Sequence, residues 1–156
     1  MEINGLTLNE IQDKSIPTQK ELISRFMIWT ENIEDKTIAG QNVDFDINFL
    51  NESSKRCGLN FTLGRRKVDQ HSIVFAHFLK RNIRPPLKDG FSNLNSDHIM
   101  YYVGLPAEPK PHRAINGARF EAEALSRLLF GRIMFDEFST YPIPDYLKTV
   151  KEVSGS

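Results

Sequence analysis

The residues best suited to do chemistry in this sequence are the lysines and arginines of GRRKVDQHSIVFAHFLKRNIR, residues 64–84. Lysine and arginine neutralise phosphates and release counterions, and arginine adds bidentate hydrogen bonds to phosphate oxygens. At about 100° per residue, a helix over 65–84 collects most of these cations on one face. Asp69 is the only acid in the segment. A solvated helix face usually mixes both signs of charge, so this one predicts a surface for a polyanion.

The candidate binding residues are this face and the cations of a later proline-rich connector. They are Arg65, Arg66, Lys67, Gln70, His77, Lys80, Arg81, Arg84, Lys110 and Arg113. Within this set, Gln70 and His77 are suited to contact bases or sugar hydroxyls. Tyr101 and Tyr102 offer a stacking surface, because every base has a face that an aromatic ring can cover.

No catalytic or metal-binding pattern stands beside these cations. His71 and His77 diverge by about 120° on a helix, so they do not share a metal. Asp44, Asp46 and Asn48 alternate, but they lack the glycine and the final glutamate of a calcium-binding loop. The sequence contains no H-E-x-x-H, G-x-S-x-G or C-x-x-C motif and no phosphate-cradling glycine loop. We expect no catalytic residue, metal or cofactor, although scattered histidines and aspartates leave an enzyme open as an alternative.

The formal net charge of zero hides a block structure. Residues 1–54 hold 4 basic and 10 acidic side chains, residues 55–119 hold 12 and 4, and residues 120–156 hold 4 and 6. Such asymmetry favours either a polyanion-binding face or pairing between the ends of one copy and the middle of another. The simpler alternative is that acidic and basic segments are neighbours within the fold.

The length and composition are those of a globular domain. With 156 residues, 40% of them apolar and 26% charged, we expect one compact domain, residues 1–156, with 1–16 as an arm and 139–156 as a docking or flexible tail. One cysteine, Cys57, allows no intramolecular disulfide. The chain has no signal peptide pattern and no run of about 18 apolar residues, so we expect a cytoplasmic protein without a membrane span.

Three principal helices are expected to position these residues. The first begins with a capping box at Thr18 and Glu21, and its apolar stripe of Leu22, Phe26, Trp29 and Ile33 is assigned to the core. The second is the basic helix over 65–84, which Pro85 and Pro86 end. Its predicted core face consists of Val68, Ser72, Phe75, Ala76, Leu79 and Ile83.

The third helix is expected from residue 116 or 117 to residue 138. It carries two apolar stripes, which favours burial between layers or a subunit contact, and Gly131 predicts close packing or a break. Alternation in 43–50, and apolar runs in 59–63 and 98–105, predict a small sheet of two or three strands. The expected fold class is therefore α+β and mostly helical.

These patterns support two functional hypotheses. The first is non-catalytic binding of RNA or DNA through the phosphate backbone, as in a coat, packaging or phage-type accessory protein. The alternative is a protein-interaction module of the inhibitor, immunity or antitoxin kind, which sets the same basic face against an acidic protein surface. A homo-oligomer through the third helix is compatible with both.

Overall fold

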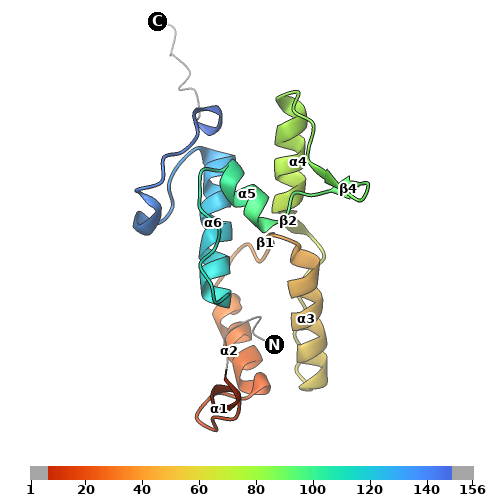
Figure 1. Cartoon of the computed structure of the whole chain (residues 1–156). Coiled ribbons are helices and arrows are strands. Elements are labelled where there is room, and N and C mark those ends of the chain that lie inside the picture. The colour runs from red at the N-terminus through yellow and green to blue at the C-terminus, as the bar shows by residue number, and fades with distance from the viewer. Residues whose placement is uncertain (1–6, 149–156) are drawn as a thin grey trace, which may run out of the picture. The chain divides into compact units, whose positions relative to one another are not determined.

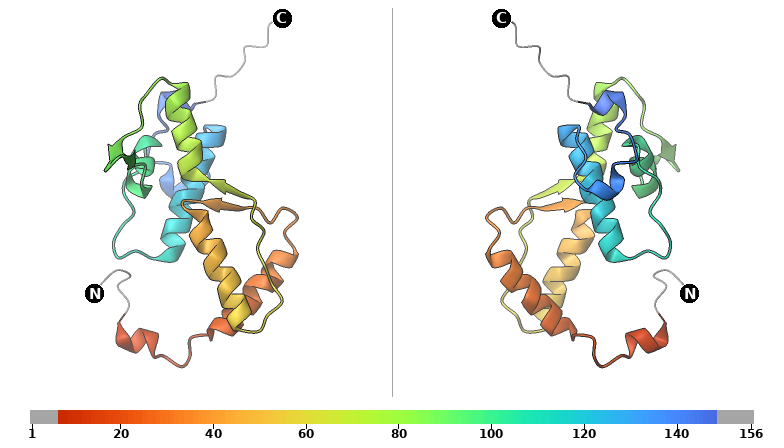
Figure 2. Two further views of the ribbon diagram at one scale, coloured as in Figure 1. Left: turned by 90° about the vertical axis from the view of Figure 1, so that its right-hand side faces the viewer. Right: turned by 90° about the vertical axis from the view of Figure 1, so that its left-hand side faces the viewer.

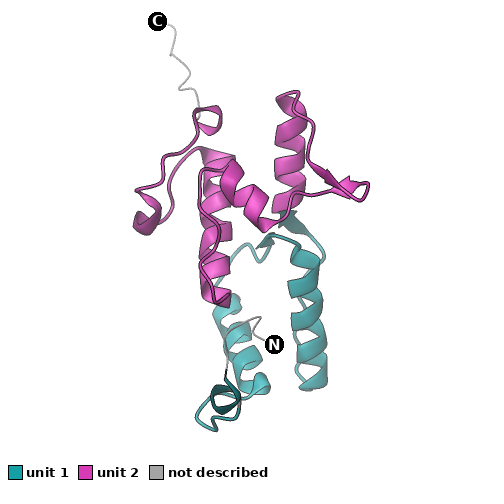
Figure 3. Cartoon of the chain, in the orientation of Figure 1, with its two compact units in different colours: residues 1–69 teal, residues 70–156 magenta. Residues whose placement is uncertain are grey.

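The computed structural model describes residues 7–148 and divides the chain into two compact units, residues 1–69 and 70–156 (Figures 1 and 3). Its described part is mostly helical, with one two-stranded sheet in each unit. This confirms the predicted α+β class, although the strands form two separate pairs. The expected single domain of residues 1–156 stays a prediction, and each unit is described below by itself.

The described part of unit 1 consists of two helices followed by a strand–helix–strand arrangement. Its strands pair in parallel, with Ile38 opposite Lys67 and Gly40 opposite Asp69. A long helix makes the crossover between them, as parallel neighbours require. The elements are α1 (Leu8–Ile11), α2 (Gln19–Glu31), β1 (Ile38–Gly40), α3 (Val43–Arg56) and β2 (Lys67–Asp69).

Two capping boxes start the first helices of this unit. The Thr18 hydroxyl accepts a hydrogen bond from the Glu21 amide at 3.3 Å, and the Glu21 carboxylate accepts from the Thr18 amide at 2.7 Å. Thr7 and Glu10 repeat the arrangement at α1. The predicted capping box is therefore confirmed, and α1 gives helical structure to part of the expected arm.

The predicted strand over 43–50 is wrong, because these residues form the first half of α3. Val43, Ile47 and the half-buried Leu50 lie at helical spacing and pack on Leu63 in the core of unit 1. Phe45 and Phe49, which made the pattern appear alternating, are 68% and 53% exposed. Acids in the first turn and bases in the last also favour the helix through its dipole.

The segment 59–63 was predicted to be a strand and is instead irregular chain that lies against α3. Leu63 is buried, and the Asn51 side chain occupies the place of a neighbouring strand. Asn51 Oδ1 accepts from the Leu63 amide at 2.7 Å, and Asn51 Nδ2 donates to the Leu63 carbonyl at 3.2 Å. One amide side chain thus satisfies a backbone that a second strand would otherwise have paired.

The assignment of Trp29 to the core is also wrong. Ile23 and Thr30 are the buried residues of α2, whereas Trp29 is 61% exposed and Leu22 is 49% exposed. Phe26 contacts Phe61 edge to face and joins α2 to the core. The face of α2 that packs on the core is therefore different from the predicted stripe of Leu22, Phe26, Trp29 and Ile33.

Over residues 70–148, unit 2 consists of three helices, a hairpin and two short 3₁₀ turns. Figure 2 shows these helices and the hairpin from two sides. The hairpin strands pair antiparallel, with Leu87 opposite Ser92 and Lys88 opposite Phe91. The elements are α4 (Gln70–Lys80), β3 (Leu87–Lys88), β4 (Phe91–Ser92), α5 (Ser96–Tyr102), α6 (Ala114–Phe130), η1 (Asp136–Phe138) and η2 (Asp145–Leu147).

The third predicted strand, 98–105, is wrong as well, because its first half belongs to α5. Asn95 caps this helix by accepting from the His98 amide at 3.0 Å. At the other end Gly104 has a φ of 78°, and the Leu105 amide donates back to the Met100 carbonyl at 2.8 Å. This is a Schellman ending, which explains the glycine.

The last long helix, α6, ends earlier than predicted. Gly131 takes the left-handed conformation at φ 61° and donates to the Arg127 carbonyl at 3.0 Å, so the break expected at this glycine is confirmed. Two polar residues inside the helix, Glu123 and Arg127, are fully buried and paired at 2.7 Å. Sequence periodicity gave no indication of this buried pair.

Two apolar clusters make up the core of unit 2. One gathers Met100, Val103, Leu105, Ala124, Phe138 and Leu147. The other gathers Val74, Leu94 and Ile99. The ring of Tyr102 packs against both clusters. Tyr102 therefore connects α4 to the rest of unit 2.

Candidate nucleic-acid interface

The helix that should carry the basic face is shorter than predicted. It begins at Gln70 instead of residue 65 and ends at Lys80. Arg65 and Arg66 lie in a loop, and Lys67 belongs to β2, because pairing with β1 satisfies the backbone of residues 67–69. The first three predicted cations therefore belong to unit 1, and the remainder belong to unit 2.

The predicted core face of α4 is also largely wrong, although one of its members, Phe75, does pack against the core of unit 2. Ser72, Ala76 and Leu79, which were assigned to the core, are exposed. Val74 is fully buried, and Phe78 packs beside it on the side that was assigned to solvent. These two apolar residues at i and i+4 were the sequence signal for the correct orientation.

This orientation of α4 turns His77 and Arg81 toward the aromatic residues of unit 2. His77 Nδ1 lies 2.6 Å from the Tyr102 hydroxyl, and Arg81 Nη1 donates to the same hydroxyl at 3.0 Å. The Arg81 guanidinium lies 3.8 Å from the centroid of the Tyr146 ring. The Tyr146 hydroxyl donates to the Tyr102 carbonyl at 2.6 Å. We call His77, Arg81, Tyr102 and Tyr146 the α4 cluster.

Burial favours the neutral form of His77 beside Arg81. The Tyr102 oxygen accepts from Arg81 and lies within hydrogen-bond distance of His77 Nδ1. Burial lowers the pKa of His77 below its ordinary value, and the charges of Arg81 and Lys80 lower this pKa further. Burial also raises the pKa of Tyr146. The cluster is thus neutral except for Arg81.

No acid of the described residues neutralises the cations at this end of α4. Lys80 and Arg84 are exposed, and neither they nor Arg81 form an ion pair within residues 7–148. One hydrogen bond to Tyr102 leaves the other four N–H groups of Arg81 without an acceptor in this part of the chain. The end of α4 therefore combines positive charge, unused donors and aromatic rings.

The cations of unit 1 have a different environment. Lys67 forms an ion pair with Asp44. Arg65 and Lys67 also line a groove along α3 whose other polar residues include Asp44, Asn48, Asn51 and Glu52. Acids and amides therefore accompany the positive charges here, and this groove suits a phosphate backbone less well than the end of α4 does.

The remaining predicted residues lie away from the α4 cluster. Gln70 is fully buried, and its side-chain amide has no hydrogen-bond partner among the described residues. Lys110 and Arg113 are exposed, and Arg113 directly precedes α6 without a capping hydrogen bond from its side chain. Because α6 begins at the opposite end of unit 2 from the C-terminal end of α4, these two cations do not extend the cluster (Figures 1 and 2).

Tyr146 is the contributor that sequence reasoning missed. It follows two prolines in the chain, and the neighbouring Leu147 is buried in the core of unit 2. The sequence signal was the apolar spacing in the tail, which predicted docking on the body or on a neighbouring subunit. Nothing in that spacing identified Arg81 as its neighbour.

Neither a metal cluster nor a membrane span is found in the described part of the chain. Within 7–148 no group of three or more histidine, cysteine, aspartate or glutamate side chains is placed to hold a metal ion. Likewise, none of the helices described has the length and apolar character needed to cross a bilayer. No family model, curated protein or solved structure matches the chain. The geometry of its own residues is therefore the basis for assigning a function.

Proposed function

We propose that the protein binds nucleic acid without catalysis, through phosphate contacts at the C-terminal end of α4. The observation that carries the proposal is the set of three cations, Lys80, Arg81 and Arg84, which have no acidic partner among the described residues. Of these, Arg81 lies beside the rings of Tyr102 and Tyr146. Cations bind the backbone whatever the sequence, and rings add stacking to unpaired bases. This combination favours single strands.

The half-buried Arg81 is the centre of the proposed surface. Tyr102 and Tyr146 hold its guanidinium in place, so a phosphate meets a donor fork that is already oriented. The neighbouring His77 stays neutral because its pKa is lowered, and it contributes no charge near pH 7. Lys80 and Arg84 add long-range attraction from the surface.

The test is fluorescence anisotropy with labelled single- and double-stranded oligonucleotides at about 50 and 200 mM salt. Lys80→Glu/Arg84→Glu is expected to lower affinity by about tenfold or more. Arg65→Glu/Arg66→Glu makes the same change of charge at exposed sites of unit 1 and is expected to bind nearly as wild type. Equal loss in both variants, or no binding by the folded wild type at low salt, overturns the proposal.

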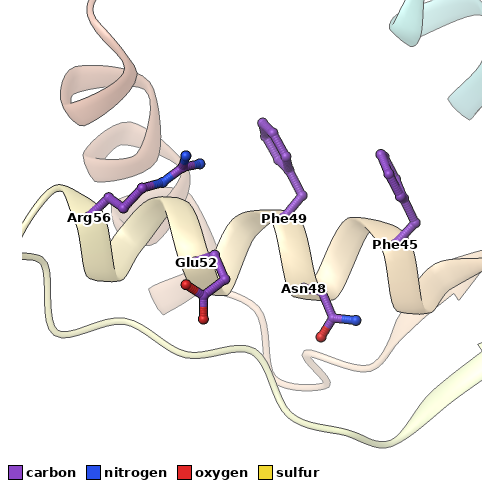
Figure 4. A pocket seen from close by; sticks show the side chains of 5 residues that line it. All are labelled: Phe45, Asn48, Phe49, Glu52 and Arg56. Atoms are coloured by element: carbon purple, nitrogen blue, oxygen red, sulfur yellow. The ribbon is translucent and has the colours of Figure 1, made fainter.

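A second candidate, a protein-interaction module, is favoured by one feature of unit 1. Phe45 and Phe49 project from the same side of α3 one turn apart, and Arg56 lies farther along the helix (Figure 4). With Asn48 and Glu52 these residues line a shallow pocket. An apolar strip bordered by both signs of charge matches a protein surface better than a phosphate backbone.

This candidate is tested by sedimentation of nucleic-acid-free protein at low and high salt. A concentration-dependent oligomer that Phe45→Ser/Phe49→Ser abolishes supports a protein interface on α3. The matched variant Ile28→Ser removes an apolar side chain that is 62% exposed on α2. Loss of the oligomer in both variants alike would contradict a specific role for α3.

A further inference from the structure

The hairpin of unit 2 places an aromatic ring in solvent. β3 and β4 are joined by Asp89 and Gly90, whose φ angles of 52° and 84° are both positive. Two positive values in a two-residue loop define the tight turn that suits the twist of paired strands, and Asp-Gly is a favoured sequence for it. Phe91 follows this turn directly and is 78% exposed. The hairpin stands out from the helices of unit 2 (Figures 1 and 2).

The base of the hairpin is fixed to the body of unit 2. The Asn93 amide donates to the Pro86 carbonyl at 2.8 Å, and His71 Nε2 lies 3.0 Å from the Ser92 hydroxyl. Leu94, two residues beyond β4, is buried against Val74 and Ile99. Phe91 is therefore presented by an anchored support, and binding through it costs little ordering of the backbone.

A cation lies beside the exposed ring. Lys88 is the direct cross-strand partner of Phe91, and paired residues of two antiparallel strands project from the same face. Lys88 is exposed and has no ion pair among residues 7–148. A ring and an ammonium on one face match the two parts of a nucleotide, a flat base and its phosphate. Asp89, which is also exposed, belongs to the turn itself.

We propose that Phe91 stacks on an unpaired base of single-stranded nucleic acid while Lys88 contacts the adjoining phosphate. This inference rests on the proposed function and adds a base-contacting residue to its phosphate contacts. An isolated ring that is 78% exposed gains little in water, whereas stacking on a base covers its face. Because a ring recognises the face of any base, Phe91 confers a preference for single strands and not for a sequence.

The test uses the one natural tryptophan of the chain, Trp29. In Trp29→Phe/Phe91→Trp the only indole is at position 91, and its emission is followed with a single-stranded oligonucleotide and with an abasic strand of the same length and charge. Emission is expected to fall with the base-containing strand and to stay nearly constant with the abasic strand. For each strand, anisotropy first establishes the concentration at which the protein is saturated. Equal quenching by both strands overturns the proposal.

Affinity gives an independent measure of the same contact. Phe91→Ala is expected to weaken binding of the single strand by about 5- to 100-fold, the usual range for one stacked base. Leu87→Ala, which shortens a 51% exposed residue of the same hairpin, is expected to leave affinity unchanged. Wild-type affinity in Phe91→Ala refutes the stacking role while the phosphate contacts of α4 stand. Absence of any binding by folded wild type refutes both proposals.

A protein partner for the hairpin is tested with the same double variant. If the hairpin meets a second copy, the indole emission of Trp29→Phe/Phe91→Trp shifts with protein concentration when no nucleic acid is present. That result overturns base stacking. A constant emission over the concentrations used for binding supports it.

Discussion

Two arginines of unit 2 are used in opposite ways. Arg127 is fully buried in α6, and all five of its N–H donors have acceptors: Glu123 and the carbonyls of Val103, Gly104, Phe138 and Tyr141. The Arg81 guanidinium makes one hydrogen bond within residues 7–148 and stacks on Tyr146. A carboxylate neutralises the first guanidinium, and no carboxylate of the described residues pairs with the second.

The difference distinguishes an arginine that stabilises the fold from one that is still able to bind a ligand. Glu123 accepts from Arg127 through one oxygen and from the amides of Met134 and Phe135 through the other, at 2.8 and 3.1 Å. That network holds the chain after α6 against the helix and has no capacity left for a ligand. Arg81 retains donors and charge, which is the condition for recognising an anion.

Breaking the buried pair should have the largest effect. Arg127→Met leaves Glu123 charged and unpaired, so we expect the free energy of unfolding of unit 2 to fall by about 3–5 kcal/mol. Denaturant unfolding followed by circular dichroism measures it. Glu123→Leu/Arg127→Met removes both charges and should recover part of this loss. A single variant as stable as wild type would show that the pair does not organise the unit.

Gly104 belongs to the same network, because its carbonyl accepts a hydrogen bond from Arg127. Its φ is 78°, and a Cβ there would lie 2.7 Å from the Pro142 carbonyl oxygen. Gly104→Ala should destabilise unit 2 by about 2 kcal/mol, measured as a lower melting temperature. Gly58, at φ 66° after α3, closes the same Schellman ending with open space around it. Gly58→Ala therefore measures the backbone strain alone. An equal loss of stability in both variants would show that the contact with Pro142 contributes nothing.

Arg81 should matter for binding more than for stability. Arg81→Ala removes one phosphate contact, so we expect about tenfold weaker nucleic-acid binding and a salt slope smaller by about 1. Loss of the contact with the Tyr146 ring should cost only about 1 kcal/mol of unfolding free energy. Anisotropy over a salt series measures the slope. An unchanged slope would remove Arg81 from the interface.

The smallest expected effect is a pH dependence from His77. Its folded pKa lies below the ordinary value of 6.5 because of burial, Arg81 and Lys80. The unfolded state therefore binds more protons as pH falls below 6.5, and stability should decline until the pH reaches the lower folded pKa. Above the ordinary value this contribution is fully present. Unfolding midpoints at several pH values, compared with His77→Asn, should show a shallower decline in the variant.

Part of the fold was predictable because local chemistry decided it. The side chains of Thr18 and Glu21 each accept a hydrogen bond from the other residue's backbone amide, and this does not depend on where α2 packs. Gly131 ends α6 because it adopts the left-handed conformation. Pro85 and Pro86 follow the end of α4 for the same kind of local reason. The α+β class is confirmed, although none of the three segments predicted as strands forms one and the strands lie at 38–40, 67–69, 87–88 and 91–92.

The rest depended on contacts between distant residues. Val43 and Ile47 fit a strand and a helix equally well, and only Leu63, held by Asn51, shows which face is inside. Likewise, α4 turns His77 and Arg81 toward Tyr102 and Tyr146 because Val74 and Phe78 pack in the core, whereas Lys80 stays exposed. Most of the residues predicted to bind are exposed cations, but their division between two units was not visible in charge spacing.

The hydrogen bonds of Arg127 can be completed only after residues later in the chain have been synthesised. Two of its carbonyl acceptors, Val103 and Gly104, are synthesised before it, but Tyr141 is added 14 residues later. A nascent chain that stops between these points holds the arginine without its full set of acceptors. The first unit ends at residue 69 and supplies none of these acceptors, so the network is completed only when Tyr141 of the second unit has been added.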